Sequence, residues 1–153
     1  MTDVLLPTQR SYCMSRIRGK NTKPELLIRQ GLFALGFRYR LHQRNLPGCP
    51  DLVLSKHRAV IFVHGCLWHG HECELFHWPR TNPLFWRKKI TRNRHNDEGN
   101  LAKLRSAGWR TLVVWECALR GKHRMNEQRL IRKVAGWLLS RKGRREILGS
   151  AAG

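Results

Sequence analysis

Acidic residues and long apolar runs are both scarce in this sequence. Its 153 residues include 10 Asp and Glu against 30 Lys and Arg, which gives a formal net charge of +20 at pH 7. A protein with so little negative charge is expected to bind a polyanion, and nucleic acid is the polyanion that this composition favours. Because the chain also lacks a basic amphipathic segment, we do not expect it to cross or coat a membrane.

Export signals, internal repeats and domain linkers are absent as well. The first residues, Met1–Pro7, are too few and wrongly charged for a signal peptide, so a cytoplasmic protein is expected. We expect residues 1–153 to form one domain, with a basic N-terminal arm over about residues 1–21 and a basic, frayed tail over about residues 141–153. The composition leaves open a static nucleic-acid-binding protein and an enzyme that acts on nucleic acid.

Apolar periodicity divides the chain into helices and strands. A capping box of Thr22 and Glu25 begins a helix that ends at Gly36, so the cap alone accounts for Glu25. Residues 79–108 are expected to form two helices or one kinked helix, and residues 126–139 a further helix. Apolar runs predict strands at residues 37–43, 51–54, 59–63 and 109–116.

The most informative stretch is residues 60–73. It begins as an apolar run, Val60–Val63, which predicts a buried strand. The next ten residues hold three histidines and two cysteines: His64, Cys66, His69, His71 and Cys73. Strand ends suit such side chains, because the rigid sheet holds them while the loop exposes them. We expect two sites here, one for a metal and one for proton transfer.

Three thiols and one imidazole form a candidate metal-binding tetrad: Cys66, His71, Cys73 and the distant Cys117. Four such ligands suit zinc, and a tetrad supplied entirely by protein is structural in type. The spacing Cys-x4-His-x-Cys differs from that of a standard zinc finger. Cys117 strengthens the interpretation because it ends another apolar strand. Buried thiols beside a surface histidine are the alternative.

Two histidines of this loop, His64 and His69, lie outside the tetrad. Histidine carries protons near neutral pH. Asp51 begins a predicted strand that pairs with the one ending before His64, which is a suitable place for a divalent-cation ligand. Together these residues suggest metal-assisted phosphodiester hydrolysis, in which the cation stabilises negative charge and a histidine moves the proton. Structural histidines and a turn aspartate after Pro50 are the alternatives.

The same residues resemble the Vsr-type very short patch repair endonucleases. The resemblance covers about residues 10–137 and rests on Pro50-Asp51, Phe62–Cys73, Phe85-Trp86, Asp97 and Val114–Gly121. It implies an α/β, restriction-endonuclease-like fold, in which helices flank a mixed sheet and a structural zinc is bound. It also implies a Mg²⁺-dependent, strand-specific DNA endonuclease. Such an enzyme nicks 5′ of the thymine in T:G mismatches left by 5-methylcytosine deamination, and so initiates very short patch repair.

The resemblance also assigns roles to individual residues. The Mg²⁺ ligands would be Asp51 and the backbone carbonyl of Val63. Four side chains would carry or support proton transfer: His69 as general base, with His64, Glu25 and Asp97. The tetrad of Cys66, His71, Cys73 and Cys117 would bind zinc. Six residues would contact DNA: Leu67, Trp68 and Trp86 as a wedge beside the mismatch, and Met14, Lys89 and Asn93 near the T:G pair.

Two positions depart from the pattern of that family. Val63 stands where threonine is common, which keeps the carbonyl but loses a hydroxyl. Leu67 stands where phenylalanine is common, which leaves less surface for stacking. The resemblance implies a monomer on double-stranded DNA in a bacterial nucleoid, with a mismatch-repair ATPase as a candidate partner. A less specific restriction-type nuclease and a non-catalytic, zinc-stabilised DNA-binding module are the alternatives.

Overall fold

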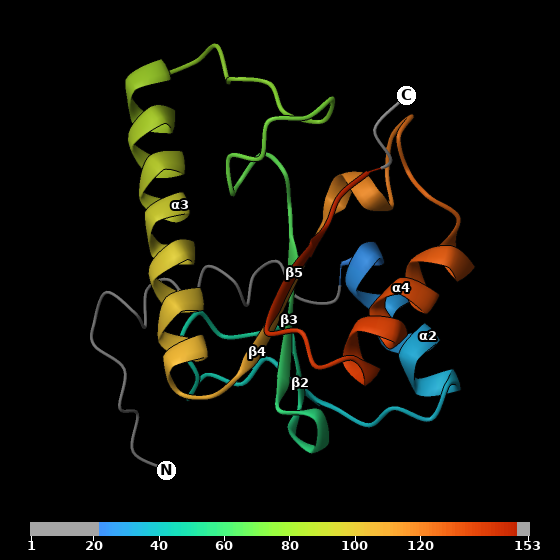
Figure 1. Cartoon of the computed structure of the whole chain (residues 1–153). Coiled ribbons are helices and arrows are strands. Elements are labelled where there is room, and N and C mark those ends of the chain that lie inside the picture. Colours follow the sequence, from blue (N-terminus) through green and yellow to red (C-terminus); the bar gives the residue numbers. More distant parts are fainter. Residues whose placement is uncertain (1–21, 150–153) are drawn as a thin grey trace.

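Residues 22–149, the part of the chain that the computed structural model describes, form a five-stranded mixed sheet flanked by helices (Figure 1). The strands follow one another across the sheet in chain order: β1 (Arg40–Leu41), β2 (Leu52–Leu54), β3 (Ala59–His64), β4 (Arg110–Trp115) and β5 (Arg144–Ile147). The β1–β2 and β2–β3 pairs are antiparallel, whereas β3–β4 and β4–β5 are parallel. Both parallel crossovers contain a helix, as parallel pairing requires.

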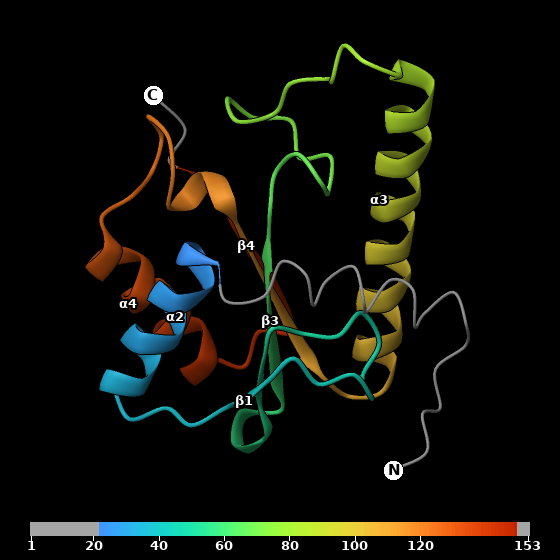
Figure 2. The same cartoon turned by 180° about the vertical axis from the view of Figure 1, so that it is seen from behind.

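The helices cover the two faces of the sheet in separate layers. Helices α2 (Lys23–Ala34) and α4 (Glu127–Leu139) lie on one face, and α3 (Pro83–Ser106) lies on the other (Figures 1 and 2). Strand β3 contributes side chains to the core on each face of the sheet. Ile61 packs in the core beneath α2 and α4, and Phe62 packs in the core on the α3 side. This arrangement confirms the expected α/β architecture. None of the helices in the described residues has the length and apolar character needed to cross a membrane.

Local sequence signals determine where the helices begin and end. The Thr22 hydroxyl accepts the Glu25 amide at 3.4 Å, which confirms the first half of the predicted cap. Gly36, with φ +94°, follows the end of α2 in a left-handed conformation that favours glycine. The Asn126 side chain caps α4 by accepting the Gln128 amide at 2.9 Å.

Two elements differ from their predicted extent. The strand expected at residues 37–43 is only Arg40–Leu41, because His42 adopts a left-handed conformation with φ +47° that ends the extended run. Of the two possibilities for residues 79–108, one continuous helix is correct, α3. Its polar middle stays helical because the inward positions there are Asp97 and Asn100, which are buried, and Gly99 lies on the exposed side.

The prediction of a frayed tail is wrong for residues 144–147. These residues form β5, which pairs along the edge of β4 and buries Ile147 to 3% exposure. The turn before β5 is held by the Arg110 guanidinium, which donates to the carbonyls of Trp137, Leu138, Ser140 and Lys142. One apolar residue in a basic segment was too weak a signal for a strand. The remaining tail (residues 150–153) and the predicted arm (residues 1–21, with Met14) lie outside the described residues.

The buried side chain of Ile147 in β5 is expected to stabilise the fold. We expect Ile147→Ala to lower the free energy of unfolding by about 2–4 kcal/mol, the range for truncating a buried aliphatic residue. Leu148→Ala is the matched control, because Leu148 is 43% exposed and should change stability by less than about 0.5 kcal/mol. Urea unfolding of the two variants and the wild type measures both values. Equal, small effects would show that the tail contributes nothing to the core.

Candidate functional site

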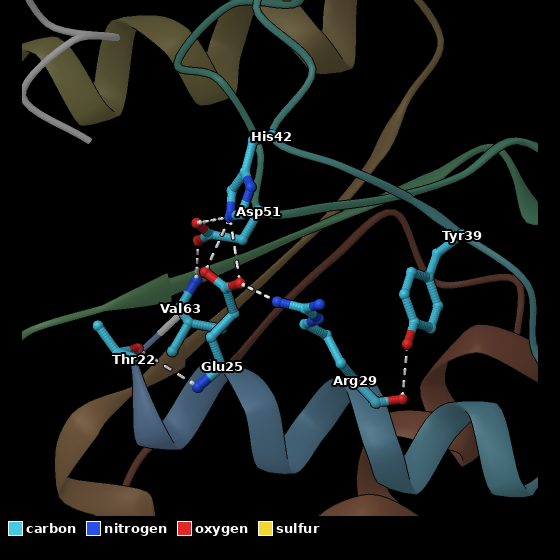
Figure 3. A network of polar contacts seen from close by, with 7 residues as sticks. All are labelled: Thr22, Glu25, Arg29, Tyr39, His42, Asp51 and Val63. Atoms are coloured by element: carbon cyan, nitrogen blue, oxygen red, sulfur yellow. Dashed lines mark hydrogen bonds and ion pairs between the residues drawn. The ribbon is translucent and has the colours of Figure 1, made fainter. Parts of the chain in front are cut away.

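Two buried carboxylates and a histidine converge beside the sheet. Glu25 comes from α2, Asp51 from the residue before β2, and His42 from the residue after β1; their ligand atoms lie within 4.8 Å of one another. His42 Nε2 lies 3.0 and 3.1 Å from the two Glu25 carboxylate oxygens and 4.0 Å from Asp51 Oδ1 (Figure 3). The exposed fractions of Glu25 and Asp51 are 1% and 5%. Such a set of oxygen and imidazole ligands can hold a divalent cation.

Backbone pairing places these three side chains. The His42 amide donates to the Asp51 carbonyl at 3.1 Å, which continues the β1–β2 ladder. The Val63 amide in β3 donates to Asp51 Oδ2 at 2.7 Å, and Arg29 donates to Glu25 at 3.1 Å. The contact between Val63 and Asp51 is therefore made by the amide of Val63. The predicted role of the Val63 carbonyl as a metal ligand stays a prediction.

A second cluster begins at the next residue of β3. The imidazole rings of His64 and His69 are stacked, with centroids 3.8 Å apart and planes 6° apart. Asp97, from the middle of α3, lies with Oδ2 2.5 Å from His69 Nδ1. All three side chains are largely buried. A buried carboxylate at Nδ1 orients the ring, which suits a proton carrier.

This second cluster opens into a cleft between α3 and the sheet. The cleft has a volume of about 400 Å³, and its wall includes His64, His69, Asp97, Trp115, Arg94 and Glu98. Because Val63 and His64 are neighbours in β3, the carboxylate cluster and the histidine cluster lie at the same end of that strand. The arrangement can hold a cation on one side and move a proton on the other.

The tetrad predicted from the sequence is assembled as expected. The ligand atoms of Cys66, His71, Cys73 and Cys117 all lie within 4.8 Å of one another. Cys117 Sγ and His71 Nδ1 are separated by 3.7 Å. Metal–sulfur and metal–nitrogen bonds of about 2.3 and 2.1 Å at a tetrahedral angle would separate such atoms by about 3.6 Å. The residues therefore fit one tetrahedral, thiophilic cation.

The surroundings of the tetrad agree with a bound cation. Burial raises the pKa of the Cys66 and Cys117 thiols and lowers the pKa of the His71 imidazole. A neutral imidazole is the form that ligates metal, and a cation offsets the cost of burying thiolates. Backbone amides point at two of the sulfurs: Gly149 donates to Cys117 Sγ at 3.3 Å and Leu75 to Cys73 Sγ at 3.4 Å.

Sequence reasoning missed two residues of these sites. Trp115 stacks on His71, with centroids 4.4 Å and planes 16° apart, and meets the His64 ring edge-on at 5.1 Å. It therefore joins the tetrad to the histidine cluster. Its position at the end of an apolar strand, two residues before Cys117, was the available signal. Nothing in the sequence pointed to a site role for His42. It alternates with the apolar residues Tyr39 and Leu41, a pattern that places it on the solvent side of a strand.

Most of the predicted DNA-contacting residues gather at the surface between the loop and the start of α3. Trp68 is 47% exposed, and its ring lies 5.4 Å from the Trp86 ring. Lys89 Nζ lies 5.1 Å from the Trp68 ring centroid, and Asn93 donates to the Trp68 carbonyl at 2.9 Å. Leu67 is half-buried in the same loop. The structure therefore brings five of the six together, and Met14 lies outside the described residues.

A mixed sheet flanked by helices, with acidic and histidine side chains at a strand end and a strongly basic composition, is typical of restriction-endonuclease-like nucleases. Comparison with known proteins narrows this class. Residues 2–75 match the family model described as DNA mismatch endonuclease Vsr. The chain is 45% identical over 136 residues to the type II nicking enzyme V.NmeAIP of Neisseria meningitidis, which covers 88% of this chain and 97% of that protein.

Two further relatives give the same result. The type II nicking enzyme V.XorIIP of Xanthomonas oryzae is 47% identical over 119 residues, which cover 78% of this chain and 88% of that enzyme. The DNA mismatch endonuclease Vsr of Escherichia coli is 39% identical over 138 residues, which cover 90% of this chain and 88% of that protein. The chain belongs to the DNA mismatch endonuclease Vsr family, and by that membership it is a DNA endonuclease.

The tetrad predicts one tightly bound divalent cation in each folded chain. Cys117→Ser removes one ligand, and we expect insoluble or unfolded protein. The reason is that a site of this kind contributes about 10 kcal/mol or more, whereas a domain is stable by about 5–15 kcal/mol. His77→Gln is the control, because His77 is an exposed histidine of the same loop and should leave folding and metal content unchanged. Metal analysis that found no cation in folded wild-type protein would contradict the prediction.

Proposed function

We propose that the protein is a strand-specific, Mg²⁺-dependent endonuclease that nicks DNA 5′ of the thymine in a T:G mismatch. Such mismatches arise when 5-methylcytosine is deaminated, and the nick would initiate very short patch repair. The observation that carries the proposal is the pairing of His69 with Asp97 at the strand end that also holds Asp51. Family membership supports it, because the relatives named above are called mismatch endonuclease and nicking enzymes.

In this proposal the two clusters at the end of β3 divide the chemistry between them. Asp51 would hold Mg²⁺, with the Val63 carbonyl as a further ligand; Glu25, expected from the resemblance to support proton transfer, lies beside Asp51 and would add a second carboxylate. When bound, the cation stabilises negative charge on the phosphoryl group. Asp97 holds the Nδ1 side of His69, so Nε2 is the nitrogen that takes a proton from the attacking water. The stacked His64 ring fixes the plane of His69 and so the direction of that transfer.

The tetrad would bind zinc in a structural role. Three thiolates and one imidazole are a zinc set, and all four positions are taken by protein, which leaves none for substrate. The ligands come from the loop that follows β3 and from Cys117 beyond β4. A zinc ion there would tie the loop carrying His69 and Trp68 to the sheet.

The pair of Trp68 and Trp86 would recognise the mismatch. Unstacking a base step costs about a few kcal/mol, and apolar wedges offset this cost through new contacts. A T:G pair is weaker than a Watson–Crick pair, so a wedge of Trp68 and Trp86, with Leu67 beside it, opens it at lower cost. Lys89 and Asn93 lie next to Trp68, where they could approach the unstacked pair.

A less specific nuclease is the second candidate. The observation that favours it is Leu67, which has less surface for stacking than the phenylalanine common at this position. The wedge would then consist mainly of the two tryptophans. A non-catalytic DNA-binding module would have no need of the buried His69–Asp97 pair. Action as a monomer and recruitment by a mismatch-repair ATPase remain proposals.

Substitution of Asp51 separates cleavage from binding. Asp51→Asn keeps the shape but removes the anionic ligand, so nicking of a T:G duplex should disappear while binding to that duplex persists. His69→Ala should nick about 10²–10⁴-fold more slowly if His69 transfers a proton. Nicking in Mg²⁺ and gel-shift binding, each with a fully paired control duplex, measure these effects. Near-normal nicking by Asp51→Asn would show that the cation is held elsewhere.

The wedge predicts that Trp68→Ala folds, keeps its metal and loses discrimination between T:G and paired DNA. The exposure of Trp68 explains why folding should survive. Trp78→Ala is the matched control, because Trp78 is 41% exposed in the same loop and packs on Phe76. The ratio of nicking rates on the two duplexes, with thermal melts alongside, measures the outcome. An unchanged ratio for Trp68→Ala would assign mismatch recognition to other residues.

A further inference from the structure

His42 is the member of the carboxylate cluster that the mechanism above leaves without a role. Its Nε2 lies 3.0 and 3.1 Å from the two Glu25 oxygens, so it faces the carboxylate almost symmetrically. The same nitrogen lies 4.0 Å from Asp51 Oδ1, and all three residues can point one ligand atom at a common centre.

These separations match those of ligands around one cation. Bonds of about 2.1 Å place neighbouring ligands of an octahedron about 3.0 Å apart and opposite ligands about 4.2 Å apart. The Nε2–Glu25 distances of 3.0 and 3.1 Å correspond to neighbouring positions. The Nε2–Asp51 distance of 4.0 Å corresponds to a wide angle across the ion.

The backbone of His42 supports a specific task for its side chain. Its φ of +47° lies in the left-handed region, which a non-glycine residue adopts at some cost. Such conformations gather at functional sites, where surrounding contacts hold them in place. Here the His42 amide donates to the Asp51 carbonyl at 3.1 Å, which keeps the imidazole over the two carboxylates.

We propose that His42 is a direct ligand of the catalytic cation and that it shifts the preference of the site from Mg²⁺ towards Mn²⁺. The inference rests on the proposed function, because it concerns the cation assigned there to Asp51 and Glu25. Mg²⁺ takes oxygen ligands and keeps several waters, whereas imidazole nitrogen suits transition cations. A set of two carboxylates and one imidazole therefore selects for a transition cation at the position where an all-oxygen set would select for Mg²⁺.

The test measures cation binding to the zinc-loaded protein without DNA. In wild-type protein, pulsed electron paramagnetic resonance of bound Mn²⁺ should show coupling to an imidazole nitrogen. His42→Gln places an amide at the same reach, so that coupling should vanish and Mn²⁺ should bind at least about tenfold more weakly. Calorimetric affinity for Mg²⁺ should stay within about threefold, because an amide oxygen is an acceptable Mg²⁺ ligand.

Two further variants control for folding and for histidine loss in general. His42→Asn carries a side chain that tolerates the left-handed backbone, so a loss of Mn²⁺ preference there does not reflect strain. His57→Gln is the matched control, because His57 lies in the 3₁₀ turn η1 (Ser55–His57), at the far end of the β2–β3 hairpin from Asp51. It should bind Mn²⁺ as the wild type does. Thermal melts of all three variants accompany the titrations.

Different outcomes overturn the two proposals. Nitrogen coupling that persists in His42→Gln, or an unchanged ratio of Mn²⁺ to Mg²⁺ affinity, would show that His42 is not a ligand, even if the wild type nicks T:G duplexes. Conversely, nitrogen coupling that depends on His42, in a protein that nicks no T:G duplex with either cation, would support the ligand and overturn the proposed function.

Discussion

The hydrogen bond from the Val63 amide to Asp51 Oδ2, 2.7 Å long, is the contact on which the site depends. It joins the residue before β2 to the end of β3, so the carboxylate is positioned by the antiparallel pairing of these strands. The next residue, His64, begins the histidine cluster. A small change in the register of β2 on β3 would therefore disturb the carboxylate cluster and separate it from the histidine cluster.

Helix α3 connects the core, the His69–Asp97 pair and the surface that carries Trp68. Ile90, Asp97 and Leu104 recur every seven residues, so they share the inner face of the helix, and Asp97 is the polar member of that stripe. Lys89 and Asn93 lie one turn apart beside Trp68. The polar middle of α3 left open, from the sequence, whether one helix or two form here. The same segment contains Asp97, which pairs with His69. Its stability comes from the apolar residues before and after it.

Trp115 gives the metal tetrad a physical connection to the histidines. It packs face to face on His71 and edge-on against His64, and it is itself buried in β4. The long loop between β3 and α3 offers few apolar side chains of its own to the core. A metal joining Cys66 and Cys73 of that loop to Cys117 would supply the cross-links that burial does not, and Trp115 would connect them to the histidine cluster.

The sequence by itself determined the helices, most strands and the ligands of the tetrad. These features depend on signals in the chain itself: apolar periods, caps, and metal-ligand types, three of them in one loop and the fourth, Cys117, at the end of another apolar strand. Only the tertiary structure decided that His42 meets Glu25 and Asp51, and that residues 144–147 form β5. His42 has a solvent-facing pattern and β5 one strong apolar residue, so neither carries a local signal. Residues 144–147 form a strand because they pair with the edge of β4. His42 takes its place because it pairs with the buried carboxylates of Glu25 and Asp51.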